Sequence, residues 1–320
     1  MTDQVYPTER RSLLKRRGFW LGLLAALVFV LAIYYPVGMA VVHRIDDDPG
    51  FRLDEGALAP NAARSVAMAA ALIRRETEQT RWVANDPWFM PGAALDNMPN
   101  FQMGVIGALA RFSFELADQL GRTRGSSQTD PDLQEAAGQL QYQGTVWVID
   151  FATSWAPTTP SEKRYQAAAR SLERYNARLA QGQAVFERRS DNLLSTLDRI
   201  ALDLGATSAA LDRHVTENAG AFLDRKADDL FYGVKGQTYA YFLVLRDLGR
   251  DFEKLIGERE LGVAWTQMLA SLEEAATLAP VVVVNGLPDS NMQPSHLAAQ
   301  GFYVLRARTQ LREITNILLK

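Results

Sequence analysis

The pattern of hydrophobic and polar residues divides the chain into one long uncharged run and a series of amphipathic segments. Residues 18–42 carry no charged side chain, and at about 1.5 Å per residue a helix of this length exceeds the ~30 Å hydrocarbon core of a bilayer. Trp20, Tyr34 and Tyr35 stand near its two ends, where aromatic rings favour the headgroup level. The run predicts a single transmembrane anchor over residues 18–42, in contact with the lipid bilayer.

The charges on either side of this run predict its orientation. Basic residues precede it, whereas Asp46, Asp47 and Asp48 follow it. Because Lys and Arg beside a first membrane helix tend to stay cytoplasmic, we expect residues 1–17 inside as a basic tail and the rest outside. A cleaved secretory signal ending near Ala40 is the alternative, although signal segments are usually shorter. Both alternatives export the same part of the chain.

The exported part begins with a stretch that lacks sustained apolar periodicity. Residues 43–57 contain Pro49, Gly50 and Gly56, which predicts a tether. We expect the folded domain to span residues 58–320, with a subdivision near residues 157–160, where two prolines stand.

Within that domain, apolar residues recur every three or four positions, the period of a helix. The predicted helices cover residues 61–82, 101–120, 131 to before 156, 241–255, 261–272 and 297–318. Residues 145–149 alone resemble a strand, and residues 281–284 are four valines that favour an extended segment or a strand. The predicted fold class is all-α: one transmembrane helix followed by an elongated helical bundle.

A seven-residue repeat follows Pro160. Large apolar residues recur at positions 165, 172, 179, 186, 193 and 200, which predicts long helices with coiled-coil-like packing. An unbroken helix over residues 161–204 would be roughly 66 Å long. Gly182 and Gly205 are the candidate breaks, because glycine weakens a helix interior.

Composition excludes several functions. The chain has a net charge of −3 and contains no cysteine. Residues 43–320 hold 29 Lys and Arg against 35 Asp and Glu, whereas residues 1–17 hold five basic and two acidic residues. A mildly acidic exported part lacks the basic surface that nucleic acid requires, and thiolate metal sites and cysteine nucleophiles are impossible. His43, His214 and His296 have no metal-ligand spacing. We therefore predict no cofactor, no metal and no nucleic-acid partner.

No catalytic motif is present. Nucleophile, phosphate-loop and dinucleotide signatures are all missing. The adjacent carboxylates at 228–229 and 273–274 would point in different directions on a helix. We assign no catalytic residue and do not predict an enzyme.

The segment from Trp82 to Phe101 is rich in large apolar side chains and contains three prolines, so regular helix is not expected there. Trp82, Trp88, Phe89, Met90 and Phe101 are candidate interaction residues, because aromatic side chains dominate binding hot spots. They would line a docking surface or ligand cleft. Alternatively, they fold onto the bundle as a plug.

A second candidate lies at residues 231–241. Gly233 and Gly236 predict a turn between helices. The neighbouring candidate interaction residues are Tyr232, Lys235, Tyr239 and Tyr241. The tyrosines would either line a pocket or cap the core.

These segments together resemble a known family. The apolar N-terminal run, the sequence Asn-Asp-Pro-Trp at 85–88 leading into Asn-Met-Pro-Asn at 97–100, and the stretch 232–241 resemble a family of bacterial proteins catalogued only as a domain of unknown function. The resemblance covers nearly the whole chain. It implies an inner-membrane anchor with a periplasmic domain, and it carries over no catalytic residue.

The resulting functional prediction is a membrane-anchored periplasmic scaffold or accessory protein that acts through contact with an envelope protein. The alternative is an envelope enzyme or ligand-binding receptor acting on peptidoglycan or lipid. A transporter or channel conflicts with a single spanning segment.

Overall fold

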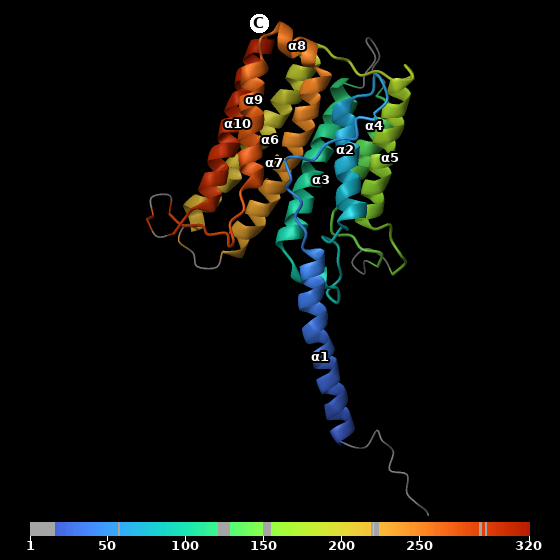
Figure 1. Cartoon of the computed structure of the whole chain (residues 1–320), viewed down its shortest axis with the longest axis vertical. Coiled ribbons are helices and arrows are strands. Elements are labelled where there is room, and N and C mark those ends of the chain that lie inside the picture. Colours follow the sequence, from blue (N-terminus) through green and yellow to red (C-terminus); the bar gives the residue numbers. More distant parts are fainter. Residues whose placement is uncertain are drawn as a thin grey trace, which may run out of the picture.

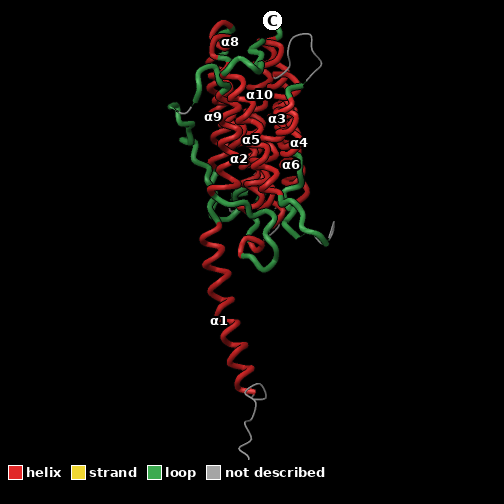
Figure 2. The backbone as a smooth tube through the Cα atoms, turned by 90° about the vertical axis from the view of Figure 1, so that its right-hand side faces the viewer, coloured by secondary structure: helices red, strands yellow, loops and turns green. Residues whose placement is uncertain are grey.

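The structure is a computed structural model that describes residues 17–320 apart from 57, 121–128, 150–154, 219, 221–223, 288–289 and 292. The predicted basic tail, up to residue 16, lies outside the described residues. The fold is all-α, as predicted from sequence: α1 (Arg17–Val42) projects from one end of a bundle of long helices that run side by side (Figures 1 and 2).

The bundle consists of α-helices joined by irregular connections, by the short 3-10 helix η3 and by the π-helical turns η2 and η4. Its elements are α2 (Arg64–Arg74), η2 (Arg75–Gln79), η3 (Pro91–Ala94), α3 (Asn97–Glu115), η4 (Leu116–Leu120), α4 (Pro131–Leu140), α5 (Ser161–Ala180), α6 (Ser190–Asn218), α7 (Arg225–Asp251), α8 (Glu253–Glu258), α9 (Gly262–Thr277) and α10 (His296–Leu318).

Among the described residues, α1 alone is long and apolar enough to cross a membrane, and by length and composition it fits either an anchor or a signal sequence. It also touches the bundle. The Tyr35 hydroxyl donates to the Trp88 carbonyl at 3.0 Å, and Gly38 lies directly against the ring of Pro91. The end of α1 is therefore packed on the loop before α3.

The centre of the bundle is a close crossing of α3 and α7. Gly104 of α3 lies against the backbone of Gly233, and Gly236 of α7 lies against the backbone of Phe101. A side chain at either position would overlap a neighbouring carbonyl oxygen. The predicted turn at residues 231–241 is therefore wrong. Gly233 and Gly236 both stand inside α7, where they allow the backbones of α3 and α7 to approach closely.

The seven-residue repeat after Pro160 belongs to two helices and not to one rod. It is broken at Gly182, whose φ is +71°, a left-handed conformation that glycine adopts without strain. Before this break, α5 packs on α2 and α4; after it, α6 packs on α10. Gly205 stays inside α6.

Neither segment that resembles a strand in sequence forms one. Residues 145–149 are irregular and follow α4, which ends at Leu140. The valines at 281–284 are also irregular, and the nearest pairing is one isolated bridge between Asn285 and Ser295. Pro99 belongs to the segment in which sequence predicts no regular helix, but it lies inside the first turn of α3. A proline is tolerated there because the first backbone N–H groups have no helical partner.

Candidate functional site

Charged side chains gather where the chain between α1 and α2 crosses the bundle. We call this group the junction cluster, and its members are Asp46, Asp47, Arg75, Glu76, Lys235 and Tyr239. Arg75, Glu76 and Lys235 are each at most 2% exposed. Charged side chains are almost never buried to this extent without partners, so their contacts decide what the cluster does.

Arg75 is the centre of the cluster. Its Nη1 donates to the Tyr239 hydroxyl at 2.7 Å and its Nη2 donates to Glu76 Oε1 at 2.8 Å. Nη1 also lies 3.4 Å from Asp46 Oδ2. The guanidinium stacks over the rings of Tyr239 and Phe51, at 4.9 and 5.1 Å from their centroids. The wide turn η2 begins at Arg75, and it brings two successive charged residues into the core.

Lys235 on α7 makes the second ionic contact. Its Nζ lies 2.6 Å from Asp47 Oδ2 and donates to the Leu278 carbonyl at 2.7 Å. Lys235 thus joins the segment after α1 to the end of α9.

The backbone of this segment is held as well. The Tyr239 hydroxyl donates to the Asp48 carbonyl at 2.8 Å. Arg246, also on α7, donates to the carbonyls of Pro49 and Phe51 at 3.1 and 2.7 Å. Residues 46–51 are therefore fastened to α7 along its length, and the connection that sequence predicts as a tether lies on the bundle.

The electrostatics follow from burial and pairing. Desolvation raises the pKa of Glu76, with Arg75 opposing it. Desolvation lowers the pKa of Lys235, and Asp47 counteracts this. Desolvation also lowers the pKa of Arg75, but the nearby charges outweigh it and the net shift is upward. Burial raises the pKa of Tyr239 to about 12. Tyr239 is therefore a neutral hydrogen-bond donor, and the cluster works as a structural ionic joint.

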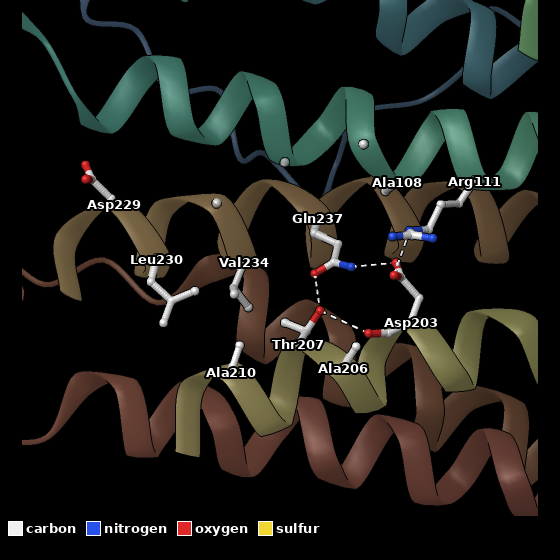
Figure 3. A pocket seen from close by; sticks show the side chains of 13 residues that line it. Ala108, Arg111, Asp203, Ala206, Thr207, Ala210, Asp229, Leu230, Val234 and Gln237 are labelled. Carbon is white, nitrogen blue, oxygen red and sulfur yellow. Dashed lines mark hydrogen bonds and ion pairs between the residues drawn. The ribbon is translucent and has the colours of Figure 1, made fainter. Parts of the chain in front are cut away.

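A pocket of about 430 Å³ lies between α3, α6 and α7 (Figure 3). In Figure 3, Arg111 and Gln237 both point toward Asp203. The Asp203 carboxylate pairs with Arg111 Nε at 2.6 Å and accepts hydrogen bonds from Gln237 Nε2 and the Tyr241 hydroxyl, each at 2.7 Å. Thr207 donates to Gln237 Oε1 at 2.8 Å. These polar side chains satisfy one another's hydrogen-bonding capacity, and in doing so they connect α3, α6 and α7.

An acidic group lies at the end of the bundle nearest α1. Burial, together with the charges of Asp96 and Asp229, raises the pKa of Asp228 to about 6. Asp229 accepts a hydrogen bond from Asn100 Nδ2 at 2.8 Å. Among the described residues, no group of three or more His, Asp or Glu side chains is arranged to hold a metal ion.

Comparison with known proteins decides the family. The family model described as "uncharacterized protein conserved in bacteria (DUF2333)" matches residues 53–222 and 223–320. The chain belongs to the DUF2333 family. This confirms the resemblance found in the sequence. No curated protein and no solved structure matches the chain.

In this DUF2333 protein the candidate interaction residues differ in their exposure to solvent. Trp82, Phe101, Lys235, Tyr239 and Tyr241 are buried, at most 3% exposed, and Met90 and Tyr232 are partly buried. Trp88 and Phe89 are 82% and 41% exposed. The structure brings Lys235 and Tyr239 together in the junction cluster, and it places Tyr241 at Asp203.

Sequence reasoning missed Arg75, Glu76 and Asp203. Arg75 and Glu76 stand in the charged stretch Arg-Arg-Glu-Thr-Glu at 74–78, which is typical of an exposed helix face. The signal that distinguishes them is tertiary, because Arg74 beside them is on the surface and pairs with Glu173 and Glu78.

Proposed function

We propose that this DUF2333 protein is anchored in the bacterial inner membrane by α1, with its N-terminus in the cytoplasm and its helical bundle in the periplasm. There it acts as a scaffold or accessory protein through contacts with another envelope protein. The anchor is retained and not cleaved.

The junction cluster is the observation that carries this proposal. The ionic joint at Arg75 and Lys235 fastens the chain after α1 to the bundle, and this would hold the surfaces of a scaffold at a fixed distance from the membrane. A cleaved signal would have no use for the additional contact between Tyr35 and Trp88. These contacts favour an anchor and a bundle that move as one body.

The flank of the bundle beside α3 offers a surface for a protein partner. A groove of about 500 Å³ has apolar and charged walls, and its lining residues are Gly107, Ala110, Arg111, Phe114, Glu115, Leu140, Gln141 and Arg199. Phe114 is 46% exposed. A large exposed aromatic side chain beside arginine side chains is typical of protein interfaces, which are enriched in both residue types.

Topology is the first test. Alkaline phosphatase fused after Lys320 is active only outside the cytoplasm, whereas a fluorescent protein that folds only in the cytoplasm would be dark at the same place. We expect an active phosphatase and an uncleaved chain on an immunoblot. An inactive phosphatase in a well-expressed fusion would overturn the orientation.

The contact itself is tested by photo-crosslinking in cells. A photoreactive residue replacing Phe114 is expected to give one discrete crosslinked product, and the same residue at Thr309, on the exposed face of α10, serves as the control. Equal or absent crosslinking at both positions under several growth conditions would count against the scaffold.

The alternative, an envelope enzyme acting on peptidoglycan or lipid, has one observation in its favour: the elevated pKa of Asp228 beside Asp96 and Asp229, since acid–base catalysts have pKa values near the working pH. Turnover of isolated cell walls or lipids that is lost in Asp228→Asn would support the enzyme and contradict our preference.

A further inference from the structure

Exposed hydrophobic side chains gather at the end of the bundle from which α1 emerges. Trp88 is 82% exposed, Phe89 41%, Val148 38% and Ile149 40%. Trp147, on the same connection as Val148, is partly exposed. We call these five residues the aromatic foot. Globular proteins rarely leave such a contiguous apolar patch uncovered without a binding role.

The rings of the foot form one connected group, although they come from two loops that are far apart in sequence. Trp88 packs edge-on against Phe89 with centroids 5.7 Å apart, and Phe89 packs in the same way against Trp147, also at 5.7 Å. The backbone behind Trp147 is fixed, because the Thr158 hydroxyl donates to the Trp147 carbonyl at 2.7 Å. The aromatic foot is thus a surface whose side chains are held in place by contacts between the two loops.

The position of the foot relative to α1 identifies what covers it. The Trp88 carbonyl accepts from Tyr35, and Pro91 packs on Gly38, about one helical turn further along α1. At about 1.5 Å per residue, Tyr35 lies roughly 10 Å before the end of α1 at Val42. The loop carrying Trp88 therefore runs back alongside α1, below the end of the bundle (Figure 1).

We propose that the aromatic foot lies in the surface of the lipid bilayer and forms a second membrane contact beside α1. Trp side chains favour the interface between headgroups and hydrocarbon, and the level of Tyr35 is that interface if α1 spans the membrane. The inference rests on the proposed anchor. It adds that the bundle stands directly on the lipid, with its long axis held by two contacts.

The chemistry of the contact is apolar. The charged residues of the first loop are paired with each other: Arg81 forms an ion pair with Asp86. The foot itself contains no basic residue. Membrane contact through this surface is therefore expected to be independent of the fraction of anionic lipid, in contrast to binding through basic residues.

The absence of cysteine allows a direct test in the full chain. Single-cysteine variants Trp88→Cys and Phe89→Cys carry a nitroxide spin label after reconstitution into phosphatidylethanolamine–phosphatidylglycerol vesicles. Oxygen concentrates in lipid and a water-soluble nickel complex is excluded from it, so the ratio of their accessibilities reports depth. Val28→Cys in α1 is the lipid reference. Val263→Cys, 72% exposed in the first turn of α9, which follows α8 at the opposite end of the bundle (Figure 1), is the water reference.

We expect labels at positions 88 and 89 to lose accessibility to the nickel complex and to gain accessibility to oxygen relative to position 263, equally in vesicles of low and high phosphatidylglycerol content. Accessibility to nickel equal to that at position 263, with position 28 in lipid, would overturn the foot and leave the anchor intact. Nickel accessibility at position 28 would refute the anchor itself. Exclusion of both reagents at 88 and 89 would indicate a protein contact and would also overturn the proposal.

Discussion

The Arg75 guanidinium donates to the Tyr239 hydroxyl at 2.7 Å, and this bond joins the turn after α2 to α7 beneath the chain that leads from α1. Both residues are almost completely buried. Arg75 also neutralises Glu76, its sequence neighbour. Replacing Arg75 therefore affects more than one hydrogen bond.

We predict that Arg75→Ala lowers the free energy of unfolding by about 3–5 kcal/mol, because it leaves the buried carboxylate of Glu76 without its partner. Denaturant unfolding followed by circular dichroism measures the change. Arg74→Ala is the matched control: its ion pairs are partly exposed, and exposed pairs contribute about 0–1 kcal/mol. Equal effects of the two substitutions would contradict the role of the junction cluster.

The close crossing of α3 and α7 gives a second prediction. Gly236→Ala places a methyl group onto the Phe101 carbonyl oxygen, and forced overpacking of this kind costs about 3 kcal/mol. Gly138→Ala in α4 has open space around the added methyl and is expected to stabilise the protein by about 0.5–1 kcal/mol, because alanine favours the helix. Thermal unfolding of the two variants separates packing from propensity. A stable Gly236→Ala protein would show that the helices do not touch there.

The hydrogen-bond network around Asp203 gives a third prediction. Asp203→Ala leaves the buried Tyr241 hydroxyl and Gln237 amide without their acceptor, and this is expected to cost about 2–3 kcal/mol in unfolding free energy. Asp198, on the same helix, pairs with Arg312 and has a side chain 40% exposed, against 9% for Asp203. Asp198→Ala is therefore expected to change stability by less than about 1 kcal/mol. A neutral Asp203→Ala would show that the network does not hold the helices.

Asp228 gives a pH-dependent prediction. Its pKa is about 6 in the folded protein, above the ordinary aspartate value of 3.8, so the folded state binds the proton more tightly and ionised Asp228 is destabilising above pH about 6. Asp228→Asn is expected to stabilise the protein at pH 7.5 by about 1 kcal/mol, a value reduced for the partial exposure of the group. The gain disappears as the pH falls below about 4. Glu274→Gln, at an exposed position, is the control, and a gain independent of pH would refute the assignment.

The parts of the fold that sequence predicted correctly are those that depend on local pattern. The uncharged run became α1, and the helical spacing of apolar residues located α3, α9 and α10. These elements follow from periodicity, which a single helix shows by itself.

The errors arose where one residue type serves two purposes. Glycine allows a turn and also a close helix crossing, and only the position of α3 shows that Gly236 does the second. Likewise, Arg74 and Arg75 are indistinguishable in sequence, yet only Arg75 faces Asp46 and Tyr239. The exposed pair Trp88 and Phe89 and the buried Trp82 were predicted together, because only the fold shows that Trp82 packs on Tyr165 while Trp88 and Phe89 stay exposed.

The fastening of residues 46–51 to α7 has a geometric consequence for any partner. The 27 residues of α7 make a rod of about 40 Å at 1.5 Å per residue. Because residues 46–51 are fastened to α7, a partner that binds the far end of the bundle would lie roughly 40 Å from the lipid surface if α1 is the proposed anchor.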